Sequence, residues 1–356
     1  MKEIPLLSTR AGLRRYLVVG YALFIVYASL TPFSGWQEQG LEFFAVLSAP
    51  LTQTYTLFDV IINLLAYLPL GLLLGLTLRT RLAPGWNVLL AVLVSMLLSA
   101  AMEYAQMYLP VRTSSNLDVL SNTLGALVGA LLALSIAPSA WFALHLTRWR
   151  MRSFHRGSAV DFGLALVALW MFAQVNPSLP MLGNVFISEV AHQPFAAAPY
   201  EPFKWLECSA VVLNLLLLGA LLLTLLRQRR DAVIALVAVL AVVALVKFVA
   251  AALLLKSWAL LLWLNSEAML GLLVGFLLLY LGMGLSHRVT LMLAGAVAAA
   301  LLFIAFFVLD GNDPASARSI YHWHYGHLLN YNGLSQTIAL SFPFLLLGYL
   351  WSIRNR

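Results

Sequence analysis

Apolar runs of about 20 residues recur along nearly the whole chain, and this limits the possible folds more than any other feature. Hydrophobic residues make up 62% of the 356 residues and charged residues only 10%, far from the roughly 45–50% and 25% of soluble domains. We therefore predict an all-α, polytopic transmembrane helical bundle. About ten spans are expected, at residues 15–31, 59–78, 86–108, 118–136, 160–175, 207–226, 231–255, 258–285, 288–309 and 336–353.

The positive charges predict the orientation of these spans. With the N-terminus inside, sixteen Lys and Arg residues fall in cytoplasmic segments, four fall outside, and Lys247 lies within a span. This distribution follows the positive-inside rule, so both termini are expected to be cytoplasmic. The basic residues form short clusters at the ends of apolar runs rather than a continuous stripe, so nucleic-acid binding is not expected.

Short motifs suggest an internal repeat. An Asn-Leu-Leu motif at Asn63 recurs at Asn214, and a Gly-x-x-x-Gly motif at Gly125 recurs at Gly271. Four spans are an even number of crossings, so the two copies would share one orientation; the alternative is chance similarity between leucine-rich helices. The predicted parts are a transmembrane domain (1–137), a basic interfacial segment (138–159), a second four-span repeat (160–287), and two further spans (288–356) with an outer loop at 310–335.

Polar side chains concentrate at the predicted outer ends of the second, third and fourth spans. Residues one helical turn apart share a helix face, and the short turn between the third and fourth spans makes those spans neighbours. The polar side chains of all three spans should therefore reach one membrane level. They are Asp59, Asn63, Glu103, Gln106, Arg112, Asp118 and Asn122.

Carboxylates near the hydrocarbon boundary are costly to ionise unless they are paired, hydrated or bound to a cation, so they are candidates for a site. Glu103 and Asp118 would act as metal ligands or as a general base. Asp59 would be a further metal ligand or would orient Arg112. A divalent cation is the candidate cofactor, because hard cations take oxygen ligands, and Arg112 would grip a phosphate.

The other polar side chains would position the ligand: Asn63, Tyr67, Gln106 and Asn122. The alternative to a site is a structural knot, in which Arg112 bridges Glu103 and Asp118.

The motifs together resemble the VanZ-like membrane family over residues 16–136. They read Asp59-x-x-x-Asn63-x-x-x-Tyr67-x-Pro69-x-Gly71, Glu103-x-x-Gln106, Pro110-x-Arg112 and Asp118-x-x-x-Asn122-x-x-Gly125-x-x-x-Gly129. Tyr67 stands where the family more often has Phe. The family takes its name from a protein linked to teicoplanin resistance, and the resemblance implies a bacterial cytoplasmic-membrane protein with functional residues at the same polar positions. It implies no defined biochemical activity.

The second half carries two intramembrane charges in the predicted spans. Lys247 and Glu267 are expected at equal depth, which predicts a structural ion pair; a proton or ion relay is the alternative. Three histidines, His322, His324 and His327, are expected in an aromatic interfacial loop, with zinc or copper binding as the alternative.

The leading hypothesis is an outer-face site that binds or processes an amphiphilic envelope component, such as a lipid-linked phosphate or a cell-wall precursor. Membrane lipids are the expected partners. A non-catalytic lipid-binding, antibiotic-binding or scaffold protein is one alternative, and a transporter is another. The sequence contains no Walker loop, no Gly-x-Ser-x-Gly motif and no His-Glu-x-x-His motif, so ATP-driven transport and zinc-protease chemistry have no support. Catalysis itself stays open.

Overall fold

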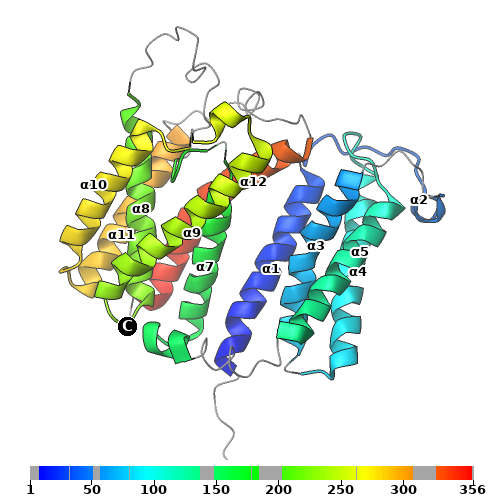
Figure 1. Cartoon of the computed structure of the whole chain (residues 1–356), viewed down its shortest axis with the longest axis horizontal. Helices are drawn as coiled ribbons and strands as arrows, with labels where there is room; N and C mark the ends of the chain where they lie inside the picture. The colour runs from blue at the N-terminus through cyan, green and yellow to red at the C-terminus, as the bar shows by residue number, and fades with distance from the viewer. Residues whose placement is uncertain are drawn as a thin grey trace, which may run out of the picture. The chain divides into compact units, whose positions relative to one another are not determined.

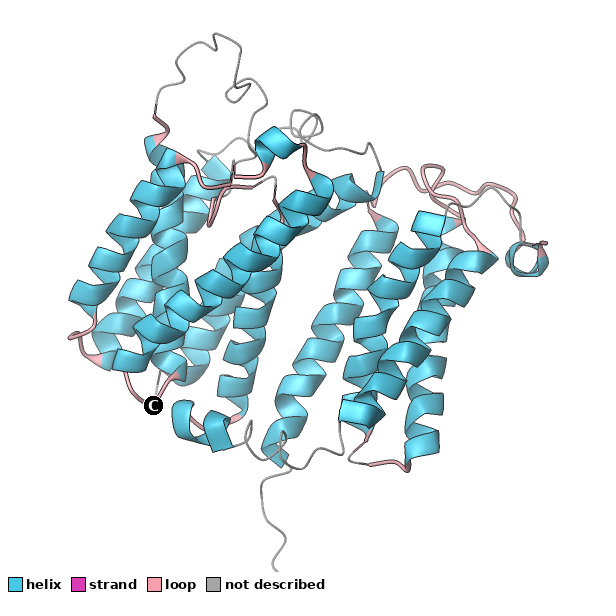
Figure 2. Ribbon diagram, in the orientation of Figure 1, coloured by secondary structure: helices cyan, strands magenta, loops and turns pink. Residues whose placement is uncertain are grey.

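The chain folds into helices that form two compact units, residues 1–149 (unit 1) and 150–356 (unit 2). The structure, a computed structural model, describes residues 8–31, 33–50, 57–79, 81–136, 148–177, 179–183, 203–261, 263–307 and 326–354. Within these ranges the regular elements are helices, without strands (Figures 1 and 2). The unit boundary falls inside the predicted basic segment 138–159, of which residues 148–153 are described as helical.

Unit 1 is a bundle in which α3 contacts α1, α4 and α5. Its helices are α1 (Ser8–Leu30), α2 (Phe43–Ser48), α3 (Leu57–Leu78), α4 (Pro84–Gln106) and α5 (Asn116–Ile136). Pro84 lies in the first turn of α4, where its missing N–H costs no helical hydrogen bond. The short helix α2 lies in the segment between α1 and α3 and contacts α5.

Glycines bring α3 and α5 into backbone contact, along what we call the α3–α5 seam. A Cβ at Gly71 would collide with the backbone of Ala126, and one at Gly125 or Gly129 would collide with backbone atoms of α3. Small residues allow such close approach, which favours helix association in membranes, where no hydrophobic effect drives it. The Gly-x-x-x-Gly motif at Gly125 is therefore a packing motif.

Unit 2 is built around α8, which is buried along most of its length. The helices are α7 (Ser158–Gln174), α8 (Trp205–Leu225), α9 (Arg230–Leu254), the 3-10 helix η2 (Ser257–Ala259), α10 (Ser266–Gly282), α11 (His287–Phe307) and α12 (Gly326–Ile353). Helix α8 contacts α7, α9, α10 and α11, and α12 packs on α7 and α11.

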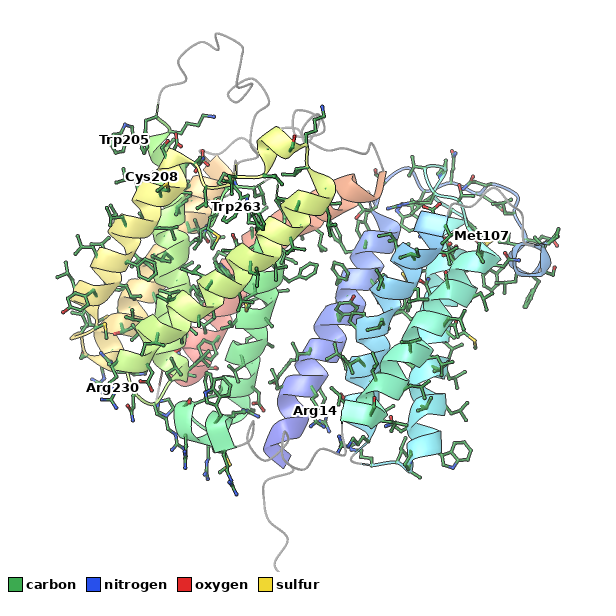
Figure 3. The ribbon with its side chains drawn as sticks, in the orientation of Figure 1. Arg14, Met107, Trp205, Cys208, Arg230 and Trp263 are labelled. Atoms are coloured by element: carbon green, nitrogen blue, oxygen red, sulfur yellow. The ribbon has the colours of Figure 1, made fainter. Side chains whose placement is uncertain are left out.

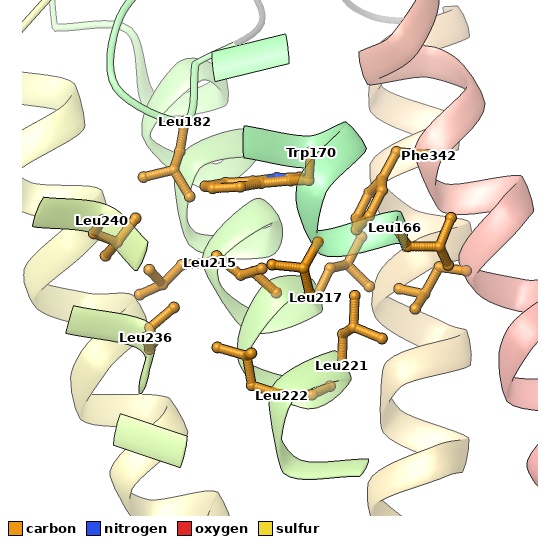
Figure 4. Packing of buried hydrophobic residues seen from close by; sticks show 14 of the residues in the cluster. Leu166, Trp170, Leu182, Leu215, Leu217, Leu221, Leu222, Leu236, Leu240 and Phe342 are labelled. Carbon is orange, nitrogen blue, oxygen red and sulfur yellow. The ribbon is translucent and has the colours of Figure 1, made fainter. Parts of the chain in front are cut away.

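A large apolar cluster fills the centre of unit 2. Figure 4 shows Trp170, Leu182 and Phe342 next to Leu215 and Leu217 of α8. All five are at most 2% exposed, so each side chain is almost completely buried inside unit 2. Unit 1 has a smaller buried cluster among its described residues, and most of its apolar side chains lie on the outside of the bundle.

Seven of the described helices are long and apolar enough to cross a membrane, so the chain is a multi-pass membrane protein. They are α1, α3, α4 and α5 in unit 1 and α8, α9 and α11 in unit 2. Three further apolar helices are shorter, at Ser158–Gln174, Ser266–Gly282 and Thr337–Ile353. Each of the ten predicted spans overlaps one of these helices, and the polytopic all-α prediction is confirmed.

The helix pairing within each unit is consistent with the predicted repeat. In unit 1, α3 contacts α1, α4 and α5; in unit 2, α8 contacts α7, α9 and α10 in the same chain order. The motif at Gly271 lies on α10 and faces Val211 and Leu215 of α8, as the motif at Gly125 on α5 faces α3. The α4–α5 contact has no counterpart of similar extent between α9 and α10. The duplication stays a prediction.

Candidate functional site

Helices α3, α4 and α5 place the predicted polar residues at one end of unit 1. Figure 3 shows Met107, which follows α4, at the end of this bundle opposite to Arg14 of α1. Asp59 lies in the first turn of α3 and Asp118 in the first turn of α5, while Glu103 lies in the last turn of α4. Alternating helix directions therefore bring two helix starts and one helix end together.

Asp118 is held by an amide from the neighbouring helix across the α3–α5 seam. Asn63 Nδ2 donates to Asp118 Oδ1 over 2.7 Å. Asp59 lies close enough to Asp118 for the two charges to repel, and both side chains are half-buried. The predicted grouping of Asp59, Asn63 and Asp118 is thus present.

Glu103 is the most buried carboxylate of the group, at 4% exposure. The backbone N–H of Ser115 donates to Glu103 Oε2 over 2.8 Å, and Ser114 Oγ donates to the Glu103 carbonyl over 2.6 Å. Both donors come from the turn between α4 and α5, so this turn folds over the carboxylate. Glu103 also interacts electrostatically with Asp118 and Arg112.

Arg112 binds the end of α1 instead of bridging the two carboxylates. Its Nε and Nη2 donate to the carbonyl of Thr31 over 3.2 and 3.0 Å, and Nη2 donates to the carbonyl of Ala28 over 3.0 Å. The last carbonyls of a helix lack helical partners and attract cations. Burial lowers the pKa of Arg112 and the charge of Glu103 raises it. The knot in which Arg112 bridges Glu103 and Asp118 is not formed.

Gln106 also binds α1, because its Nε2 donates to the Ser29 carbonyl over 3.0 Å. The segment before α3 covers the same region: Gln39 Nε2 donates to the Met107 carbonyl over 2.8 Å, and Asn116 Nδ2 donates to the Ala49 carbonyl over 2.6 Å. Gln106 therefore holds α1 against α4, and the hydrogen bond of its side chain goes to α1 rather than to a carboxylate of the predicted site.

A second polar layer lies one helical turn further into the bundle. Asn122 Nδ2 donates to Ser99 Oγ over 2.9 Å, while Asn122 Oδ1 and the Tyr67 hydroxyl are covered and have no hydrogen-bond partner. The Tyr67 hydroxyl interacts with Ser99 and, electrostatically, with Glu103 and Asp118. Tyr67 and Asn122, predicted to position a ligand, thus both approach Ser99, one helical turn from Glu103 on α4.

The buried face of α4 carries polar residues that the sequence prediction missed. It consists of Asn87, Ala91, Ser95, Ser99 and Glu103, each four residues apart. Such a period of small polar residues in an apolar span is readable from sequence, because residues four apart share a helix face. Serines are easily overlooked in this setting, since they can bond their own helix, as Ser95 Oγ does with the Ala91 carbonyl.

The three carboxylates do not form a metal centre. Among the described residues, no group of three or more His, Cys, Asp or Glu side chains is arranged to hold an ion. The predicted metal site at Asp59, Glu103 and Asp118 is therefore not supported. His322 and His324 lie outside the described residues, and so does the side chain of His327.

The predicted ion pair between Lys247 and Glu267 is wrong. Lys247 is fully buried and its Nζ donates to the Gln174 carbonyl at the end of α7, over 3.0 Å. Glu267 is half-buried in the first turn of α10 and accepts from the Lys204 backbone N–H and the Ser266 hydroxyl. The predicted span began too early, at residue 258, and so placed Glu267 too deep.

Unit 2 contains a buried carboxylate that the sequence prediction also missed. Glu207, 4% exposed in the first turn of α8, accepts from Asn265 Nδ2 over 3.0 Å. Asn265 caps α10, since its side chain accepts from the Ala268 backbone N–H over 2.9 Å. The pairing of an acidic residue with an amide across two helices resembles that of Asp118 with Asn63.

The polar end of unit 1 can therefore offer carboxylate and amide oxygens at the ends of three helices that are long and apolar enough to cross a membrane. Residues 13–137 match the family model described as VanZ/LLP1, and this range contains α2 to α5 and most of α1. Searches of curated proteins and of solved structures returned no match. The N-terminal part of the chain is thus a VanZ-like membrane domain.

Proposed function

We propose that unit 1 binds the polar headgroup of an amphiphilic cell-envelope component at the ends of α3, α4 and α5. One observation carries this proposal: Glu103, a carboxylate only 4% exposed, interacts electrostatically with Asp118 and with the Tyr67 hydroxyl, and Asn122 Oδ1 and that hydroxyl are covered and make no hydrogen bond. A carboxylate at membrane depth is expensive, and such residues are functional candidates by default.

The alternative of a structural knot is less favoured by these contacts. In a knot the polar groups would satisfy one another, and buried groups in proteins are nearly always hydrogen-bonded. Here Arg112 is used by α1, and Asn122 Oδ1 and the Tyr67 hydroxyl have no partner. A bound molecule would supply the missing partners.

The candidate ligands are a lipid-linked phosphate, a cell-wall precursor or another membrane lipid. A role in glycopeptide resistance is one possible consequence of binding such a component. The positive-inside distribution of Lys and Arg favours a bacterial cytoplasmic membrane with both termini inside and the site facing outward. Binding alone would suffice for a non-catalytic protein, whereas an enzyme would also use Glu103 or Asp118 as a base.

The lipids that copurify with the protein test this proposal. We expect at least one polar lipid class to be present in the wild type and depleted in Glu103→Gln and Asp118→Asn, because each change removes a carboxylate while keeping its shape. Glu267→Gln, a carboxylate outside the site, is the matched control. Mass spectrometry of the bound lipids gives the readout, and thermal unfolding shows whether the variants are folded. An identical lipid complement in folded variants would refute the proposal.

Transport is a second candidate function, favoured by the polar face of α4. Glu103 lies sixteen residues after Asn87, so this face extends over about 24 Å of helix, most of a bilayer core. Single cysteines at positions 87, 95 and 99 in a Cys208→Ser background test it. A transporter should allow water-soluble reagents to label these positions from either side of the membrane, whereas labelling from one side only would exclude transport through this face.

A further inference from the structure

Two polar layers can be distinguished at the site of unit 1. The upper layer consists of Asn63, Glu103 and Asp118, one residue from each of α3, α4 and α5. The lower layer consists of Tyr67, Ser99 and Asn122, and each of its members lies four residues further into the same helix. One helical turn, about 5.4 Å, separates the layers, so a single headgroup can reach both.

Most hydrogen-bond donors around these layers are already used by the protein, and the exception is the Tyr67 hydroxyl. The Arg112 guanidinium donates to the carbonyls of Ala28 and Thr31. Asn63 Nδ2 donates to Asp118, and Asn122 Nδ2 donates to Ser99. A phosphate is recognised by donors, above all by the paired N–H groups of arginine. Few donors remain here to bind one.

The oxygens of the two layers, in contrast, form a surface rich in acceptors. Asn122 Oδ1 is an acceptor without a partner on a side chain 5% exposed, and the Tyr67 hydroxyl is without a partner on a side chain 4% exposed. Glu103 and Asp118 interact electrostatically with the Tyr67 hydroxyl, and Asp118 lies one helical turn from Asn122 on α5. An incoming phosphate would find the Tyr67 hydroxyl as its one donor, next to two acidic side chains and an amide oxygen that cannot donate to it. A group that donates hydrogen bonds would satisfy them.

We propose that the site selects an amphiphile with an ammonium headgroup, and that it discriminates against a phosphate at the contact point. This inference rests on the proposed function, because it assumes that the same site binds a headgroup. An ammonium carries three donors and no acceptor, so it matches a site whose oxygens at Asn122, Tyr67 and Glu103 need donors. Its positive charge also offsets the repulsion between Glu103 and Asp118.

Three amphiphiles with one common dodecyl tail test the headgroup: dodecylammonium, dodecyl phosphate and dodecyl glucoside. The full chain is placed in nanodiscs of uncharged lipid, and binding is followed by native mass spectrometry. We expect dodecylammonium to bind at least about tenfold more tightly than dodecyl phosphate. The glucoside, which donates through hydroxyls, should fall between them. Glu103→Gln should weaken ammonium binding, and Glu267→Gln should leave it unchanged.

Tyr67→Phe separates binding from folding most cleanly. The ring still packs, and the hydroxyl that it removes makes no hydrogen bond of normal geometry and interacts only weakly with Ser99, so removing it should change the melting temperature little. Ammonium binding should weaken roughly threefold to tenfold, as expected for one lost hydrogen bond. A lower melting temperature with unchanged binding would show that the hydroxyl is structural and would overturn the inference.

The outcomes also separate this inference from the proposed function. If dodecyl phosphate binds best and Arg112→Gln abolishes its binding, the headgroup assignment is wrong while the site itself stands. If no amphiphile depends on Glu103 or Tyr67, water fills the polar layers and the proposed function fails with the inference.

Discussion

Both units bury amide and charged side chains among apolar helices, but they satisfy them differently. In unit 2, Glu207 is bonded to Asn265, Gln174 and Asn214 bind the backbone of Leu182, and Lys247 binds a helix-terminal carbonyl. The covered atoms without partners among the described residues of unit 2 are ring nitrogens of Trp170 and His287. In unit 1 they are oxygens of Tyr67, Asn87 and Asn122.

This difference distinguishes structural polar groups from candidate binding groups. The Leu182 contacts hold a buried segment, residues 179–183, against α7 and α8, so the polar groups of unit 2 fix the fold. In unit 1, the Tyr67 hydroxyl and Asn122 Oδ1 make no hydrogen bond that would hold one helix to another. Such buried oxygens lower the stability of the fold unless a ligand or a water molecule binds them. A similar pairing of a carboxylate with an amide occurs in both units. It can therefore serve helix packing in unit 2 and ligand binding in unit 1.

A cation at the end of the first helix is common to both units. Arg112 bonds the last carbonyls of α1, and Lys247 bonds the last residue of α7. In each case the cation offsets the negative end of a helix dipole. The acceptors are backbone carbonyls in both contacts. A search of the sequence for acidic partners of Arg112 or Lys247 would therefore miss these contacts.

The largest expected effect concerns the close packing in unit 1. Gly71→Ala should cost about 3 kcal/mol or more, the upper range for overpacking, because the new Cβ meets the backbone of Ala126, which cannot move independently. Gly275→Ala in unit 2 should cost less, since its Cβ meets the mobile end of Leu215 at 2.5 Å. Thermal unfolding in detergent measures both. Gly20→Ala, with open space around it, is the control; equal losses at Gly71 and Gly275 would refute the contrast.

A smaller effect is expected at Lys247 in unit 2. Lys247→Ala should cost about 2–3 kcal/mol, because it leaves a cavity and an unpaired carbonyl at Gln174. Lys247→Met keeps most of the volume but leaves the same carbonyl unpaired, so it should cost about 1–2 kcal/mol, less than Lys247→Ala. The unfolding midpoints of both variants, each compared with that of the wild type, measure the two losses of stability. A loss as large for Met as for Ala would mean that the ammonium group itself, rather than its bulk, holds the unit.

The smallest effect concerns the coupling of Lys247 with Glu267. Because the two side chains bind different partners, Lys247→Met and Glu267→Gln should be additive within about 0.5 kcal/mol. The double-mutant cycle is measured from unfolding free energies of the four proteins. A coupling above about 1 kcal/mol would revive the ion pair that the structure excludes.

Helix positions and the polar grouping were predictable from sequence because both depend on periodicity. Asp59, Asn63, Asp118 and Asn122 follow the four-residue spacing of a helix face; the first three lie together, and Asn122 binds Ser99 one helical turn deeper. The start of α10 was not predictable from hydropathy, since the described residues between 258 and 264 are apolar yet lie in a 3-10 helix, turns and a bend. Asn265, a preferred capping residue, was the available signal. The contacts of Arg112 could not be predicted, because its acceptors are backbone carbonyls. Every residue carries such a group, so the sequence does not mark which ones Arg112 binds.

The α3–α5 seam has a consequence for how a ligand would enter. Tyr67 and Asn122 belong to α3 and α5, and these helices touch through their backbones at Gly71, Gly125 and Gly129. The pair cannot part without losing that contact, so it behaves as a fixed wall. A headgroup can then enter only if α4, or the turn at Ser114 and Ser115, moves away from this pair of helices. A crosslink between α4 and α5 should therefore slow the exchange of bound ligand.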